Sequence, residues 1–168
     1  KSRRLGVIGS PSSNTSLSID VSQESYEASL LGNFCIMETR QDGCFIYPIG
    51  QVTSISLRNP YLERHSIRKI ISVRGEASPL TEQHDVRLVE LFVGSCFNER
   101  DGHLFPSVMG SVPPTGSPVY QLSQELVNTI VGDLSMDVSY IGRMYNTQIH
   151  LPMVFRHFAK GDKGLGEA

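Results

Sequence analysis

Two apolar runs separated by a short polar stretch in residues 31–57 predict two strands joined by a tight turn. Asp42 and Gly43 separate the two apolar runs. An Asp-Gly pair favours a type I′ hairpin turn because both of its central residues take positive φ. Pro48 and Gly50 interrupt the second run, which predicts a bend or a bulge inside one long strand. A long strand that bends near its middle can close a small barrel.

Five other segments carry strand patterns. In residues 16–21 the apolar and polar side chains alternate strictly, which predicts a strand with one wet face. Residues 85–97 are apolar on both faces toward their end, which is typical of a strand in the middle of a core rather than at an edge. Shorter strands are predicted at residues 4–9, 140–143 and 148–155.

Two segments show helical spacing instead. Residues 61–74 place isoleucines at helical intervals and are rich in charged residues, which favours a helix, although alternation of the same side chains also fits a strand. Ser123 is placed to cap a second helix, which Gly132 is expected to end. The apolar stripe of this helix consists of Leu126, Val127, Ile130 and Val131. The predicted fold class is therefore mainly β: a small closed β-barrel with one or two short inserted helices.

The composition narrows the classes of function. The 168 residues fit one domain, with 39% hydrophobic residues, 19% charged residues and a net charge of −2. A nearly neutral chain lacks the strongly basic character that marks most nucleic-acid-binding domains, although a local basic patch is compatible with it. No apolar run approaches the roughly 18 residues of a membrane span, so no membrane partner is expected. The basic N-terminus is not followed by an apolar region, so no signal peptide is predicted.

The three cysteines, Cys35, Cys44 and Cys96, have no CxxC spacing. A two-residue turn would place Gln41 opposite Cys44 and Cys35 opposite Gly50. The first two thiols would then lie roughly 20 Å apart, at about 3.3 Å per residue, which is outside disulfide range. We therefore expect reduced thiols and a cytoplasmic protein. The second and third cysteines are expected in the core because they follow apolar strand patterns.

No group of residues predicts an active site. No serine, cysteine or histidine lies in a nucleophile motif such as GxSxG, and Asp42 and Asp101 each precede a glycine, which assigns them to turns. The glycine-rich end of the chain fails the phosphate-loop pattern, because Gly166 is followed by Glu167 instead of lysine. The histidines are scattered without metal-ligand spacing, so no metal site is predicted. They are His65, His84, His103, His150 and His157.

Two basic clusters are candidates for binding. The first has a functional interpretation, docking onto an acidic partner or a nucleic acid, and an alternative as the solvated face of a helix. It consists of Arg64, Arg68, Lys69 and Arg74. The second, near the end of the chain, could lie close to a nucleotide or nucleic acid handled by a following domain, or could simply be solvated. It consists of Arg156, His157, Lys160 and Lys163.

An aromatic cluster keeps a nucleic-acid hypothesis open. Phe34, Phe45 and Tyr47 fall on one face of the central hairpin, with Arg40 nearby. Exposed aromatic rings beside basic residues are the platform on which single-stranded nucleic acids stack. A free-standing barrel of the oligonucleotide-binding kind is therefore the alternative function.

The order of several segments resembles a known family. RLGVIG, GNFCIME, GQVTSI, VRLVELFVGSCF and VPPTGSPVY follow one another as in the N-terminal barrel of HerA-like hexameric ATPases, a domain that these enzymes share with the ATP synthase subunits. Residues 141–168, IGRMYNTQIHLPMVFRHFAKGDKGLGEA, resemble the stretch that in HerA proteins runs directly into the ATPase core. The resemblance covers nearly the whole chain.

The resemblance implies a domain organisation and a function. Residues 1–158 would form the barrel, with insertions at about 61–84 and 98–109 that contact partners, and residues 159–168 would link it to an ATPase core outside this chain. The chain itself would be a non-catalytic oligomerisation and docking domain of an ATP-dependent DNA translocase. ATP, Mg²⁺ and DNA would bind the absent core, where the Walker motifs lie, so no catalytic residue is carried over. The implied partners are five further subunits and an effector, either a NurA-type nuclease or, in bacterial antiphage systems, a sirtuin-like NADase.

Overall fold

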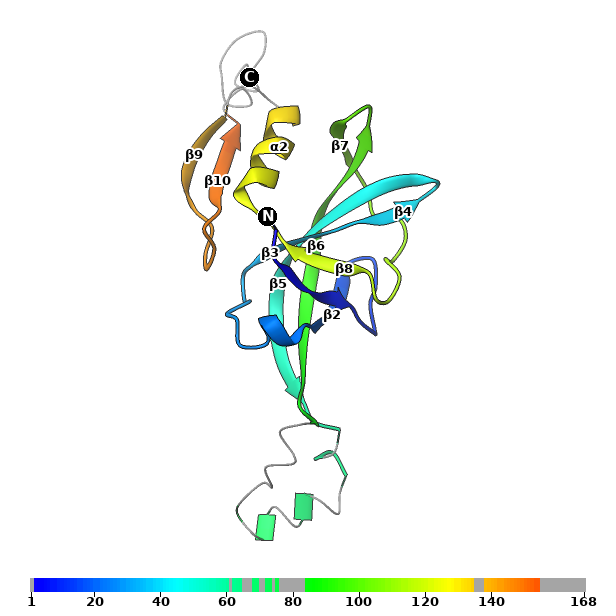
Figure 1. Ribbon diagram of the computed structural model, residues 1–168, viewed down its shortest axis with the longest axis vertical. Coiled ribbons are helices and arrows are strands. Elements are labelled where there is room, and N and C mark those ends of the chain that lie inside the picture. Colours follow the sequence, from blue (N-terminus) through cyan, green and yellow to red (C-terminus); the bar gives the residue numbers. More distant parts are fainter. Residues whose placement is uncertain are drawn as a thin grey trace, which may run out of the picture.

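Six antiparallel strands close into a β-barrel (Figure 1). The computed structural model describes residues 2–60, 62–64, 68–69, 72–73, 75, 84–134 and 138–154. The barrel strands are β1 (Arg4–Ile8), β2 (Ser16–Val21), β3 (Phe34–Met37), β5 (Cys44–Arg58), β6 (Val86–Arg100) and β8 (Pro118–Gln121). Outside this ring lie η1 (Gln23–Ser25), β4 (Thr39–Gln41), β7 (His103–Ser107), α2 (Gln124–Leu134), β9 (Val138–Arg143) and β10 (His150–Val154). The predicted fold class, mainly β with a small closed barrel, is confirmed.

The pairing of β5 with β6 closes the barrel. Each of these strands has 15 residues, and the ladder between them runs from the pair Ile46–Asn98 to the pair Arg58–Val86. The ring continues from β5 through β3, β8, β1 and β2 back to β6. Two register shifts interrupt this ladder: the first, opposite Ile49 and Gly50, skips Gly94 of β6, and the second skips Thr53 of β5. The first irregularity thus lies beside Gly50, in the stretch of β5 where Pro48 and Gly50 predict a bend or a bulge.

The barrel interior is filled by alternate residues of its strands. Leu17, Cys35 and Leu91 have no exposed surface, and removing a side chain of this size from water stabilises a fold by about 1.5–3 kcal/mol. Met109, from the β7–β8 connection, also reaches this core. The other core residues are Leu5, Ile8, Ile19, Leu30, Met37, Ile46, Val52, Val89, Cys96 and Val119.

A second core lies outside the barrel, beneath α2. Val127, Ile130 and Val131 of the helix are buried there, as their spacing predicts. Ser123 caps the helix, since its hydroxyl accepts a hydrogen bond of 3.3 Å from the Leu126 N–H. Three barrel strands contribute the buried residues Ile36, Ile49 and Phe97. Leu122, just before α2, and Ile149, just before β10, complete this core.

The expected end of this helix at Gly132 is wrong, because α2 continues to Leu134. A glycine inside a helix costs about 1 kcal/mol. Burial of Ile130 and Val131 just before it outweighs that cost.

Two hairpins extend the sheet beyond one end of the barrel. Asp42 and Gly43 turn β4 into β5 with φ of 51° and 80°, and Asp101 and Gly102 turn β6 into β7 with φ of 53° and 80°. Both are the left-handed conformations that two-residue turns require. Residues 98–109, expected as an insertion, thus contain the end of β6, the turn and β7.

The molecule is long because the β5–β6 ribbon runs along it (Figure 1). At one end the ribbon leads into residues 59–85. Arg58 forms an ion pair of 2.8 Å with Glu63 there, and the Asn59 amide donates to a carboxylate oxygen of Asp85 at 2.6 Å. Of the helix predicted at 61–74, residues 68–69 and 72–73 are helical, and most of the rest lies outside the described residues.

The strands predicted at 140–143 and 148–155 form a hairpin of their own, β9 with β10, which does not join the barrel. Residue 155 lies outside the described part of the chain. Within that part, no helix has both the length and the apolar character that crossing a bilayer requires.

A substitution at Gly50 tests how closely β5 packs against β6. A Cβ at this position would lie 2.6 Å from the Phe92 carbonyl oxygen and 2.7 Å from atoms of the Leu91 side chain. We expect Gly50→Ala to lower the free energy of unfolding by about 2 kcal/mol or more, because backbone must move to admit the methyl group. Urea denaturation followed by circular dichroism measures this loss.

Gly94→Ala is the matched control, since a Cβ there meets no atom within 4 Å although the residue also lies in a barrel strand. We expect it to change stability by about 0.5 kcal/mol or less. Equal losses in the two variants would contradict the packing argument.

Candidate docking surfaces

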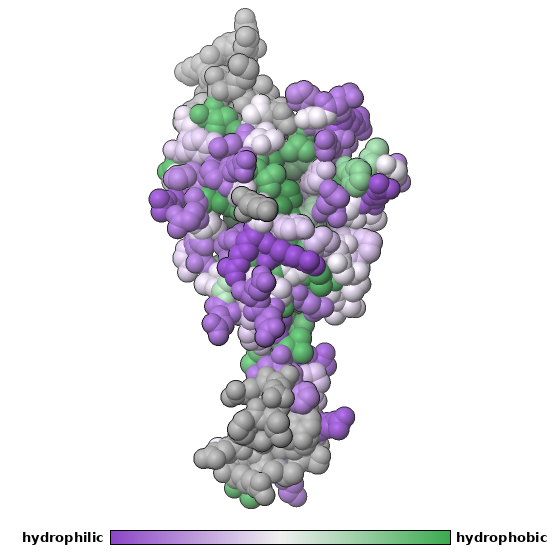
Figure 2. Space-filling view, in the orientation of Figure 1, coloured by the Kyte–Doolittle hydropathy of each residue, from purple (hydrophilic) through white to green (hydrophobic). Residues whose placement is uncertain are grey.

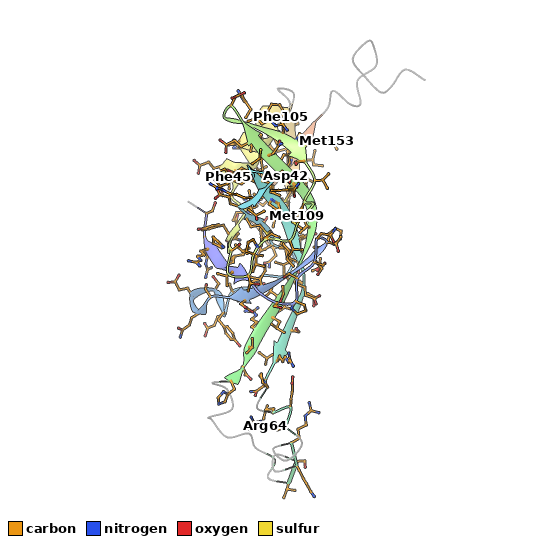
Figure 3. The ribbon with its side chains drawn as sticks, turned by 90° about the vertical axis from the view of Figure 1, so that its right-hand side faces the viewer. Asp42, Phe45, Arg64, Phe105, Met109 and Met153 are labelled. Atoms are coloured by element: carbon orange, nitrogen blue, oxygen red, sulfur yellow. The ribbon has the colours of Figure 1, made fainter. Side chains whose placement is uncertain are left out.

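The first basic cluster lies at the far end of the β5–β6 ribbon. Arg64, Arg68 and Lys69 are exposed, and Arg74 lies outside the described residues. Figure 3 shows Arg64 at the end of the molecule opposite Phe105 and Met153. The second basic cluster, from Arg156 to Lys163, also lies outside the described part of the chain.

The predicted aromatic cluster is only partly open. Phe34 and Tyr47 are partly buried in the core beneath α2. The Tyr47 hydroxyl donates a hydrogen bond of 2.9 Å to Glu99, and partial burial together with this carboxylate raises the pKa of Tyr47 to about 12. Phe45 remains 40% exposed, with the Arg40 guanidinium 4.5 Å from its ring centroid.

A second exposed phenylalanine does not complete this platform. Phe105 pairs with Asn98, which pairs with Ile46, so these three side chains share one face of the sheet. Phe45, next to Ile46 in the strand, points to the other face. The rings of Phe45 and Phe105 therefore cannot stack neighbouring bases together.

The cysteines follow the predicted register. Gln41 pairs with Cys44, and Cys35 pairs with Gly50, as expected. All three thiols are free. Burial raises the pKa of Cys35 to about 12 and also raises that of Cys96. The expectation that Cys44 lies in the core is wrong, because it follows the turn in the hairpin beyond the barrel and is exposed.

Two shallow hollows are present on the described surface. One, of about 560 Å³, lies beside β1 and β2 and is lined by Arg4, Asp20 and Glu24 among others. The other, of about 290 Å³, lies where α2 begins and includes Arg3 and Ser123. Neither lining contains a histidine or a cysteine, and no group of three potential metal-ligating side chains occurs among the described residues.

An apolar surface on the β9–β10 hairpin has no counterpart in the sequence analysis. We call it the hairpin surface, and it consists of Leu31, Tyr140, Ile141, Tyr145 and Leu151. Tyr145 is the most exposed of them, at 79%. Figure 2 shows hydrophobic residues on the upper part of the molecule, where this hairpin and α2 lie. Contiguous exposed apolar residues commonly mark interaction sites.

Asn146 holds the turn of the hairpin against the barrel. It takes a left-handed conformation with φ of 56°. Its amide donates hydrogen bonds of 3.0–3.1 Å to the Ser29 carbonyl, the Ser29 hydroxyl and the Leu31 carbonyl. The neighbouring Tyr145 ring lies so close to Gly32 that a Cβ there would be 3.0 Å from a ring carbon. The turn that carries this exposed aromatic side chain is thus tied to the segment before β3.

Polar side chains of α2 hold the strands of the hairpin. The Gln124 side chain accepts the His150 backbone N–H at 2.7 Å and donates to Asn128 at 2.8 Å. The Asn128 oxygen also accepts the Tyr140 hydroxyl at 2.6 Å. The hairpin surface is therefore preorganised, which lowers the entropy that a partner must overcome on binding. The sequence could not show this, because its hydrogen bonds join residues as far apart as 117 positions.

In comparisons with known proteins, no family model and no curated protein matches the chain. Its function is therefore argued from the fold and from these surfaces.

Thiol reactivity tests the burial of the cysteines. Only the thiolate reacts with disulfide reagents, and burial disfavours its formation at Cys35 and Cys96. We expect Ellman's reagent to modify one thiol rapidly in the native protein and all three in denaturant. The rapid phase should disappear in Cys44→Ser and persist in Cys96→Ser; rapid modification of a second thiol in the native state would contradict the assignment.

Removing the Asn146 amide tests the anchoring of the hairpin. Asn146→Ala loses all three hydrogen bonds and places alanine at a positive φ. We expect a loss of about 1–2 kcal/mol in unfolding free energy and faster hydrogen exchange in residues 29–33. Gln148→Ala, an exposed residue of the same turn, is the control. Unchanged hydrogen exchange of residues 29–33 in Asn146→Ala would contradict the anchoring role of this side chain.

Proposed function

We propose that this chain is a non-catalytic assembly and partner-docking barrel of a HerA-like hexameric ATP-dependent DNA translocase. ATP, Mg²⁺ and DNA would be bound by an ATPase core outside this chain. The barrel architecture supports this proposal, as does the order of segments described above. The barrel itself would act as a scaffold without catalysing a reaction, and the proposed place of action is the cytoplasm.

The observation that carries the proposal is the contrast between the closed barrel and its projections. A closed barrel leaves no edge of its own for pairing. The exposed aromatic and aliphatic side chains of the hairpin surface lie on a projection, fixed to the barrel by Asn146 and to α2 by Gln124 and Asn128. Ordered apolar anchors of this kind favour protein contacts over chemistry.

A partner of this barrel would be an effector protein, of the NurA-type nuclease or sirtuin-like NADase kind. The exposed Arg64, Arg68 and Lys69 fit an acidic surface on it. They lie at the opposite end of the molecule from the hairpin surface (Figures 1 and 3), so the two surfaces can act independently. Repetition around a ring would strengthen weak contacts at either surface.

The alternative is an oligonucleotide-binding barrel, and one contact supports it. Phe45 is exposed and accompanied by Arg40, as a stacking site requires. Fluorescence anisotropy with a labelled oligothymidylate at low salt tests this alternative. Binding that is lost in Phe45→Ala would favour it, and an unchanged anisotropy would end it.

The complete protein that carries this chain tests the assembly proposal. We expect mass photometry to show a particle of six subunits. Triple reversal of Arg64, Arg68 and Lys69 to glutamate should preserve this mass and weaken binding of the neighbouring effector, because it repels an acidic surface. Reversal of Arg40 to glutamate, at the other end, is the control. A complete protein that stays monomeric and ignores its effector would contradict the proposal.

A further inference from the structure

One carboxylate lies beside the first basic cluster, at the far end of the β5–β6 ribbon. It belongs to Glu63, which is the only acidic residue between Arg58 and Gly75. Arg58 binds both of its oxygens, donating from Nε to Oε1 at 2.8 Å and from Nη2 to Oε2 at 3.1 Å. This paired contact is the geometry in which a guanidinium recognises a carboxylate most specifically. The fork of Arg58 is therefore already filled by a group of the same chain.

Hydrogen bonds fix the turn that carries Glu63. The backbone N–H groups of Leu62 and Glu63 both donate to the Asn59 carbonyl, at 3.0 and 3.2 Å. The Asn59 amide in turn donates to Asp85, in front of the opposite strand, at 2.6 Å. Nε of Arg68 donates to the Leu62 carbonyl at 3.1 Å. The turn therefore brings the guanidinium of Arg68 to the same place as the Arg58–Glu63 pair.

Both arginines act on this carboxylate. The hydrogen bond from Arg58 and the charges of Arg58 and Arg68 lower the pKa of Glu63, against a smaller opposing effect of desolvation. Glu63 is therefore ionised at neutral pH. Its negative charge cancels part of the positive charge that an approaching acidic surface would meet.

The contact between Arg58 and Glu63 is exchangeable because it is exposed. The two side chains are 60% and 43% exposed. An ion pair in water contributes little to stability, so a carboxylate from another protein can replace Glu63 at small cost. A buried pair would resist such an exchange, since removing one partner leaves an uncompensated charge.

We propose that Glu63 is an internal competitor that fills the carboxylate-binding fork of Arg58, and that an acidic protein partner displaces it on docking. An aspartate or glutamate of the partner takes the place of Glu63, and Arg58 becomes a fourth basic contact beside the first basic cluster (Figure 3). A carboxylate is the favoured occupant because the group bound there within the chain is itself a carboxylate. This inference rests on the proposed function and gives its acidic partner a specific contact.

Fluorescence anisotropy of labelled poly-L-glutamate with this chain tests the competition. We expect Glu63→Gln to lower the dissociation constant about threefold, because it frees Arg58 and removes a repelling charge. Glu125→Gln is the matched control, since it makes the same change of charge at an exposed position in α2, at the other end of the molecule. It should leave the affinity nearly unchanged. Circular dichroism checks that each variant is folded.

A double-mutant cycle separates displacement from a simple change of net charge. Arg58→Gln should weaken binding by a factor about three times larger in the Glu63→Gln background than in the presence of Glu63, because only the free fork is fully available to the polyglutamate. Independent charges would give equal factors. A duplex oligonucleotide in place of polyglutamate tests whether a phosphate is preferred.

Equal effects of Arg58→Gln in the two backgrounds would overturn the internal competition and leave the docking proposal standing. Coupling that appears with the duplex alone would overturn the choice of a carboxylate. Failure of both the unchanged chain and Glu63→Gln to bind polyglutamate overturns the inference as well, whereas the proposed assembly is judged separately, by the particle mass and effector binding of the complete protein.

Discussion

The long antiparallel ladder between β5 and β6 is the contact on which the rest of the structure depends. It closes the ring of six strands, and its excess length carries the fold beyond the barrel at both ends. One end supports the hairpin extensions β4 and β7, and the other leads to the basic insertion. The two strands approach closely at Gly50, where an added Cβ would lie 2.6 Å from the Phe92 carbonyl oxygen. A glycine at this position thus allows the close approach of β5 and β6 on which the barrel depends.

The second core, beneath α2, determines which side chains remain exposed for binding. α2 packs over the second core, against which Phe34 and Tyr47 are partly buried, so two of the three rings of the aromatic cluster are not fully open to a ligand. The same helix uses its first turns to hold the β9–β10 hairpin through Gln124 and Asn128. One element therefore closes a potential stacking face and presents an apolar hairpin. This exchange favours protein contacts over nucleic-acid contacts.

The features that the sequence predicts correctly depend on interactions between residues close together in the chain. The Asp-Gly turn, the register from Gln41–Cys44 to Cys35–Gly50 and the apolar stripe of α2 each depend on residues within a few positions of one another. The failures depend on distant partners. Cys44 is exposed because its hairpin outruns the barrel, and Gly132 stays helical because its neighbours are buried. The hairpin surface could not be foreseen at all, since the contact between Asn146 and Ser29 has no local signature.

The strand edges of this fold are protected from pairing with other chains in several ways. Closure removes the edges of the barrel strands. Outside the barrel, the Gln41 side chain of β4 binds the backbone at Val108 and Gly110, and β7 contains Pro106. In β10 the Gln124 side chain accepts the His150 N–H. Each of these devices restricts pairing with another chain. In β9 the ladder passes from the pair Gly142–Leu151 to the pair Tyr140–Pro152, which leaves Ile141 as a bulge that interrupts the strand. Because strand pairing is restricted in these ways, the exposed side chains of the described residues, rather than open backbone, are the surfaces available to a partner.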